Sequence, residues 1–332
     1  MHMADALVSP AVGLVMYGAT AAAAGYSIYK VRLEENTKKV PMMAVMSAFV
    51  FATQMLNFTI PGTGSSGHLC GGFLLSAILG PYAGFLSMIV ILLTQCLLFA
   101  DGGLLALGAN VWNMAFYGCF LGYFCIYRPM MKKGFSNVKL GISSILACVI
   151  TLQFGAFSVV LETLLSGITD LPFGTFVAAM QPIHLAIGLV EGLISAAVLI
   201  FIYNTRPELL TNDEMKTNKE FSMKKLLVIL SIAVVVCAGG ISLVASSNPD
   251  GLEWSMEQVA GSTELEDSGD SAYATAANIQ DTTALLPDYA FKDSDSAVGT
   301  SFSGILGAAI VAGLCLVICL AFGFFRHKKK KA

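Results

Sequence analysis

Charged residues are scarce in this sequence. Only 12% of its 332 residues are Asp, Glu, Lys or Arg, whereas 56% are hydrophobic. Both fractions lie far from the averages of soluble proteins. The composition therefore excludes an ordinary soluble fold and predicts an integral membrane protein that has the lipid bilayer as its surroundings. The formal net charge of −3 gives no reason to expect nucleic-acid binding.

Two further features are missing. The segment 248–300 contains no cysteine, and all eight cysteines lie in or beside apolar stretches without a CxxC pair. No disulfide framework or cysteine metal site is expected, and the cysteines are interpreted as small buried apolar residues. The chain also lacks the GxxxxGK[ST] phosphate loop. It is therefore not expected to be an enzyme that hydrolyses ATP.

Apolar stretches long enough to cross a bilayer as a helix, which takes about 20 residues, recur along the chain. The expected fold is all-α, with a seven-span unit (1–205), a polar linker (206–225) and a two-span unit (226–332) that brackets the segment 248–300. The nine predicted spans are 8–29, 41–60, 68–80, 82–100, 104–127, 140–165, 173–204, 226–246 and 302–325.

Basic clusters set the expected orientation. Lys38-Lys39 and the group Arg128, Lys132 and Lys133 should both be cytoplasmic, so an even number of spans separates them. Splitting 68–100 at Pro81 provides that number, and leaves open whether 68–80 spans or re-enters. The amino terminus is then outside and the carboxyl terminus inside. Segment 248–300, with 11 acidic residues and one lysine, is expected to be an outer, mobile connector.

The chain begins with Met1-His2, and no cleavable secretory signal is recognisable there. We therefore expect Met1 to keep a free amine. That amine, the amide nitrogen of residue 2 and Nδ1 of His2 can bind one metal ion as a fused chelate. One corner of a planar set stays open for a second imidazole. Planar nitrogen ligands suit Ni²⁺ or Cu²⁺, and ligation by an amide requires its deprotonation.

His68 is the best candidate for the open corner. It follows the glycine-rich turn PGTGSSG and lies on the same predicted outer side as His2. Three other polar residues, His184, Asn110 and Asn113, are possible supports that orient a ligand. Each has a simpler interpretation, because a polar side chain inside a span can merely bond a neighbouring helix or a freed carbonyl.

At this point the sequence resembles a known family. The starting MH, FTIPGTGSSGH, FADGGLLALGANVWNM and PIHLAIGLVEG together resemble the substrate-binding M subunit of nickel/cobalt energy-coupling-factor transporters, the CbiM/NikM family. NPDGLEWS (248–255) and LLPDY (285–289) resemble the small N subunit. The chain is thus similar to an M–N fusion. The resemblance implies that Met1, His2 and His68 bind the transported metal.

The same resemblance implies a place and partners. The protein is expected in the cell membrane as the substrate-specific component, without a cofactor, capturing Ni²⁺ or Co²⁺ as cargo. A transmembrane coupling subunit (T) and cytoplasmic ATPase subunits (A) would supply the energy. Nickel is slightly favoured by the affinity order for nitrogen ligands. Cobalt uptake for cobalamin biosynthesis is the alternative.

Two readings from other classes compete. Ser66 within GSSG and His184 in a later span can be read as nucleophile and base of an intramembrane serine protease, which needs the two within hydrogen-bond reach. A structural membrane protein without a ligand is the other. Neither reading explains a histidine at residue 2, and the second predicts no metal dependence on it.

Overall fold

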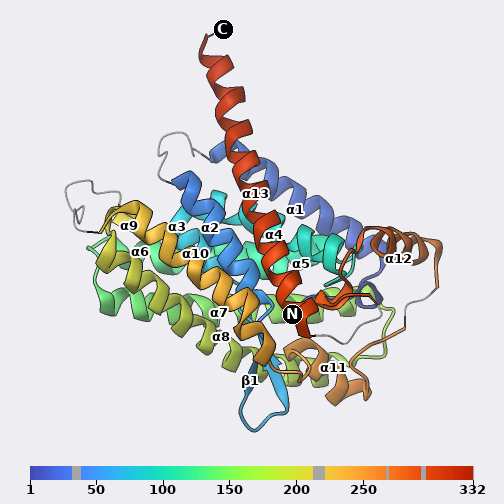
Figure 1. Ribbon diagram of the computed structural model, residues 1–332. Coiled ribbons are helices and arrows are strands. Elements are labelled where there is room, and N and C mark those ends of the chain that lie inside the picture. Colours follow the sequence, from blue (N-terminus) through green and yellow to red (C-terminus); the bar gives the residue numbers. More distant parts are fainter. Residues whose placement is uncertain (32–38, 212–220, 267–268, 293–296, 332) are drawn as a thin grey trace.

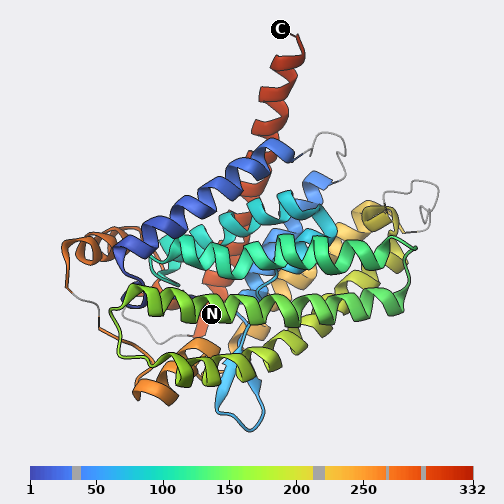
Figure 2. The same cartoon turned by 180° about the vertical axis from the view of Figure 1, so that it is seen from behind.

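The chain folds into a bundle of helices that run mostly side by side (Figures 1 and 2). The computed structural model describes residues 1–31, 39–211, 221–266, 269–292 and 297–331. Before the linker it has η1 (Asp5–Leu7), α1 (Pro10–Lys30), α2 (Lys39–Gln54), β1 (Phe58–Ile60), β2 (Ser65–Gly67), α3 (Gly72–Leu79), α4 (Pro81–Phe99), α5 (Leu107–Val111), the π-helix η3 (Trp112–Tyr127), α6 (Arg128–Met131), α7 (Asn137–Ser166) and α8 (Phe173–Thr205). After α8 come α9 (Glu208–Thr211), α10 (Met223–Gly239), η5 (Ile241–Val244), α11 (Gly251–Ala260), α12 (Ser271–Thr283), η6 (Pro287–Tyr289) and α13 (Ala297–Lys331).

The helical content and apolar length confirm a multi-pass membrane protein. Among the described residues, 6 helices are long and apolar enough to cross a membrane, and Val40–Gln54 is a shorter apolar helix. The predicted number of nine spans is not confirmed. Helix α3 has eight residues and a length of about 12 Å, well short of a bilayer core of about 30 Å. The predicted break before Pro81 is confirmed, because α3 ends at Leu79 and Pro81 begins α4.

Helices α7 and α8 form the most extensive helix pair of the bundle. Small residues of α8 allow the two backbones to approach closely. A Cβ added at Gly192 would lie 2.6 Å from Cα of Ile145, and one added at Gly188 would lie 3.0 Å from Cα of Val149. Such close contact supplies van der Waals packing. In lipid this packing holds helices together, because the hydrophobic effect does not drive their association there.

Segment 248–300 is not the mobile connector that its composition predicts. Its described part forms α11 and α12, which pack against α8 and α4 respectively. The hydroxyl of Tyr273, a buried residue of α12, donates to the carbonyl of Val8 at 3.0 Å, and Gln280 Nε2 donates to the carbonyl of Gly102 at 2.9 Å. The composition of the segment did not predict these helices, because only one face of each is apolar and most of their residues are polar or small.

Two smaller features complete the fold. The predicted linker 206–225 contains α9, and Arg206, just before this helix, forms a buried ion pair with Glu208, its first residue. Residues 212–220 of the linker lie outside the described part. Cys125 is exposed and Cys237 half-buried, whereas the other six cysteines are buried. Cys125 lies on η3 and Cys237 on α10, so the prediction that all eight are buried is wrong for these two.

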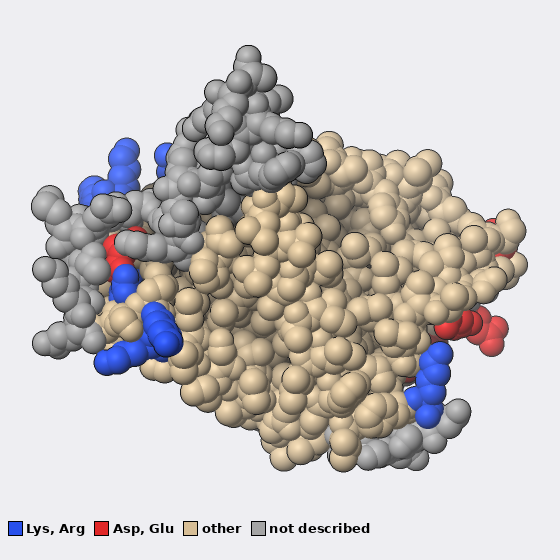
Figure 3. All heavy atoms as spheres, turned by 45° about the horizontal axis from the view of Figure 1, so that its top comes forward, with Lys and Arg blue, Asp and Glu red and all other residues tan. Residues whose placement is uncertain are grey.

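Charge is distributed as a membrane protein requires. On the face shown in Figure 3, the described charged side chains gather at the two ends of the bundle, and the broad surface between them is free of charge. We call the end that carries α11 and α12 the site end, and the opposite end, with α6 and α9, the basic end (Figure 1).

Candidate metal-binding site

The amino terminus is buried at the site end of the bundle. Met1 is 4% exposed and Met3 is fully buried. The backbone around Met3 is fixed from both sides: its amide donates to Asn110 Oδ1 at 2.7 Å, and its carbonyl accepts from Asn110 Nδ2 at 3.0 Å and from the amide of Gly103 at 2.9 Å. Because Asn110 pairs with both backbone groups, it holds the first residues in an extended course into the protein.

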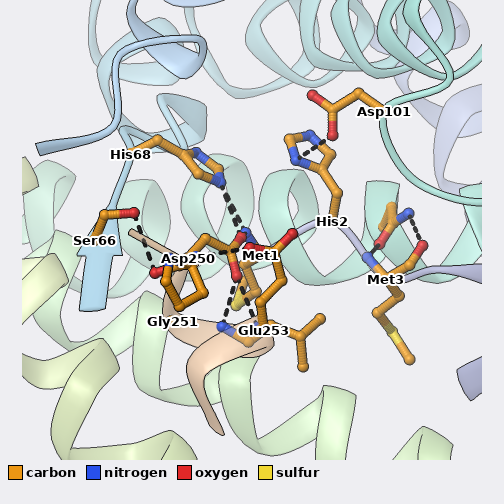
Figure 4. A network of polar contacts seen from close by, with 12 residues as sticks. Met1, His2, Met3, Ser66, His68, Asp101, Asp250, Gly251 and Glu253 are labelled. Carbon is orange, nitrogen blue, oxygen red and sulfur yellow. Dashed lines mark hydrogen bonds and ion pairs between the residues drawn. The ribbon is translucent and has the colours of Figure 1, made fainter. Parts of the chain in front are cut away.

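The hairpin of β1 and β2 brings His68 to the same place. Its strands pair antiparallel, with Phe58 opposite Gly67, and His68 follows directly. His68 Nδ1 lies 3.1 Å from the carbonyl oxygen of Leu69, an acceptor, so the ring proton belongs on Nδ1. The lone pair of Nε2 then points at the Met1 nitrogen, 2.7 Å away (Figure 4).

His2 completes the cluster. Its ring stacks on that of His68, with centroids 5.2 Å apart and an angle of 18° between the planes. The structure thus brings together the three residues that the sequence singles out as metal ligands. One detail differs from the expected chelate: Nδ1 of His2 faces the carboxylate of Asp101, 3.2 Å away.

Two carboxylates border the cluster, and neither was predicted as part of it. Oδ2 of Asp250 contacts the Met1 ammonium and lies 3.7 Å from Nε2 of His68 (Figure 4). Asp101 contacts His2. A weak signal existed for each: Asp101 is an acid next to an apolar span, and Asp250 begins a D-x-x-E capping pattern. Neither pattern indicates which residues the carboxylate would meet.

Burial and these carboxylates set the ionisation of the cluster. Burial lowers the pKa of His2 to about 4, despite the neighbouring Asp101, so its imidazole is neutral at pH 7. Neutral imidazole is the form that binds metals. Burial opposes the charge on the Met1 amine, but Asp250 outweighs it and raises the pKa of this amine. In turn, burial would raise the pKa of Asp250, yet the Met1 ammonium holds it well below its usual range.

The three possible supporting residues differ in how close they come. Asn110 binds the Met3 backbone, as described above. Asn113 donates to Glu162 Oε2 at 2.6 Å and lies 3.6 Å from the sulfur of Met3. His184 Nδ1 pairs with the carbonyl of Met180 at 2.7 Å, and its buried Nε2 has no hydrogen-bond partner among the described residues. Together with Met1 and His68, His184 lines a small cavity.

A metal site at this cluster would need main-chain nitrogen ligands. Within the described ranges, no group of three or more His, Cys, Asp and Glu side chains is placed to hold a metal ion. The terminal amine and an amide would have to supply the remaining ligands beside two imidazoles. An open cavity of about 580 Å³ borders the cluster, and its walls include Asp101, Asp250, Glu253, Glu264 and Asp288. None of the described residues that line it is Lys or Arg, so its field attracts cations.

The geometry gives no support to a serine protease. The hydroxyl of Ser66 donates to the carbonyl of Asn248 at 2.8 Å, and Nδ1 of His184 is engaged with Met180. No hydrogen bond joins Ser66 to His184 in the part of the chain that the structure describes. A nucleophile whose proton is donated to a carbonyl has no base to activate it.

Comparisons with known proteins point to metal transport. Residues 2–209 match the CbiM family, described as the cobalt uptake substrate-specific transmembrane region, and residues 224–323 match the PDGLE domain. A putative fused nickel transport protein NikMN of Archaeoglobus fulgidus is 35% identical over 321 residues, which cover 95% of this chain and 96% of that protein. A probable fused nickel transport protein LarMN of Lactiplantibacillus plantarum is 30% identical, over 93% of this chain and 95% of that protein.

A solved structure shares part of the fold. The crystal structure of a truncated transition metal transporter superposes with a TM-score of 0.54 at 33% sequence identity. The match covers 61% of this chain and 99% of that one.

Proposed function

The chain belongs to the CbiM family of cobalt-uptake transmembrane proteins and carries a PDGLE domain, and from this premise we propose that it is the substrate-specific component of an energy-coupling-factor transporter. It would capture Ni²⁺ or Co²⁺ at the outer face of the cell membrane through Met1, His2 and His68. The metal is the transported substrate. Coupling (T) and ATPase (A) subunits on other chains would drive its uptake, since this sequence has no phosphate loop.

One observation supports this proposal above all others. The Met1 nitrogen lies 2.7 Å from Nε2 of His68, inside the protein and beside the ring of His2. A chain terminus is normally solvated and mobile. A terminus that is buried next to two histidines is explained if its amine binds the metal together with them. To bind the metal, the Met1 amine must then release Asp250, and Nδ1 of His2 must release Asp101.

Nickel is the slightly favoured cargo. Nitrogen ligands bind Ni²⁺ more tightly than Co²⁺ in the general affinity order. The fused relatives quoted above are named as nickel transport proteins, whereas the family description names cobalt. Uptake of both metals, measured in parallel in cells with and without the gene, tests the choice. Cobalt accumulation alone would favour a supply to cobalamin biosynthesis instead.

Uptake should depend on a partner ATPase, while binding should not. Inactivating the ATPase subunit is expected to reduce metal accumulation to the level of cells that lack this chain. The purified chain should still bind Ni²⁺, because all proposed ligands belong to it. Accumulation driven by this chain without any ATPase would contradict the assignment to an energy-coupling-factor system.

The proposed orientation places the site end outside. Ala274, an exposed residue of α12, replaced by Cys should react with an impermeant thiol reagent added to intact cells. The exposed Lys224, replaced by Cys at the start of α10, is the matched control and should react only after the cells are opened. The reverse labelling pattern would show that the site end faces the cytoplasm and would contradict this orientation.

A further inference from the structure

Among the described residues of the second unit, Asp250 is the one whose side chain contacts the Met1 amine. Asp250 lies at the N-terminus of α11, where its two oxygens have different partners. Oδ1 accepts from the amides of Leu252 at 2.8 Å and Glu253 at 3.0 Å, while Glu253 Oε2 accepts from the amide of Asp250 at 2.9 Å. This reciprocal capping fixes the carboxylate plane to the helix. Oδ2 is left facing Met1 and His68.

The backbone that carries Asp250 is itself docked on the first unit. The amide of Ser66 donates to the carbonyl of Pro249 at 2.8 Å, and Trp254 Nε1 donates to the carbonyl of Thr63 at 3.0 Å. Gly251 lies against α8, since a Cβ added there would come within 2.8 Å of Ile187 Cδ1 and 3.1 Å of His184 Cε1. The hairpin and α8 therefore determine where the Asp250 carboxylate stands.

We infer that Asp250 is a positioning residue, through which the second unit holds the terminal amine beside His68 ready for metal capture. This inference rests on the proposed function. Without an anchor, the first residues of a chain sample many conformations, and ordering them when the ligand arrives reduces affinity. Asn110 fixes Met3, but among the described residues the Met1 nitrogen itself contacts Asp250 and His68. The second unit thus raises the metal affinity of the site without providing a metal ligand.

Titration of the purified full chain with Ni²⁺, keeping an authentic Met1, tests this role. Asp250→Asn and Asp250→Ser both retain a side chain that caps a helix but lose the carboxylate. Each is expected to weaken Ni²⁺ binding about tenfold, the lower end of the effect of partners that orient a ligand. The absorption band of bound Ni²⁺ should keep its position, because the metal ligands are unchanged. Glu257→Gln, on the exposed face of the same helix, removes one charge and should bind like the wild type.

Several results would overturn the inference. Wild-type affinity in both variants would show that Asp250 does not position the amine. A loss in Asp250→Ala that is absent in Asp250→Ser would reduce its role to capping α11. Tighter binding in the variants would show that the carboxylate competes with the metal. In all three cases the wild-type band survives and the proposed function stands. If the wild-type chain binds neither Ni²⁺ nor Co²⁺, both the proposed function and the role of Asp250 are contradicted.

Discussion

Adding a single residue ahead of Met1 is expected to abolish metal uptake. The added residue turns the terminal amine into an amide and moves His2 to position 3. It also has no room, because the Met1 nitrogen is enclosed between His68 and Asp250 and the residue is 4% exposed. The extension must therefore displace the first residues from the protein. Uptake of Ni²⁺ and Co²⁺ into cells that express the partner subunits is the measurement.

Binding and uptake should separate in this experiment. A histidine at position 3 can close a planar set of four nitrogens without His68, so the extended chain can still bind Ni²⁺ in a different site. A residue added after Ala332 changes neither the amine nor the position of His2, and serves as the control. Normal uptake by the N-terminally extended chain would refute a role of the terminal amine.

Removing either imidazole is expected to cause the second large effect. His2→Ala and His68→Ala should each weaken Ni²⁺ binding by at least about a hundredfold, since even partners that only orient a ligand contribute 10–100-fold. His2→Ala should have the greater effect, because its imidazole closes the fused rings of the proposed chelate. Metal titration of the purified chain with a free Met1 amine gives both affinities.

Two further variants show whether the loss is specific. His327→Ala, in the basic tail, should bind Ni²⁺ like the wild type. His184→Ala tests the support proposed for that residue. It should have a smaller effect than His68→Ala, because His184 Nδ1 is paired with the carbonyl of Met180 and its Nε2 has no hydrogen-bond partner among the described residues. If His68→Ala keeps wild-type affinity, the open corner of the chelate is not closed by His68.

The sequence predicts the parts of this protein that depend on composition or on covalently adjacent atoms. Long apolar stretches predict membrane helices because the bilayer accepts little else, and the break before Pro81 follows from a residue that cannot continue a helix. The candidate chelate is similarly local, since the amine, the amide and the imidazole belong to Met1 and His2. Sequence reasoning also selected His68, and the structure brings it within 2.7 Å of the Met1 nitrogen.

Only the tertiary structure decided what surrounds these residues. Asp250 is 249 residues from Met1 along the chain, and no local pattern could pair its carboxylate with that amine. Segment 248–300 has the composition of a solvated connector, yet α11 and α12 form because the first unit offers surfaces to bury one face of each. The eight-residue α3 is likewise stable only within the bundle, because an isolated helix of that length is marginal. Contacts between distant segments arise from packing, whose energy depends on the assembled fold, and the pattern of one segment does not show which other segment it will contact.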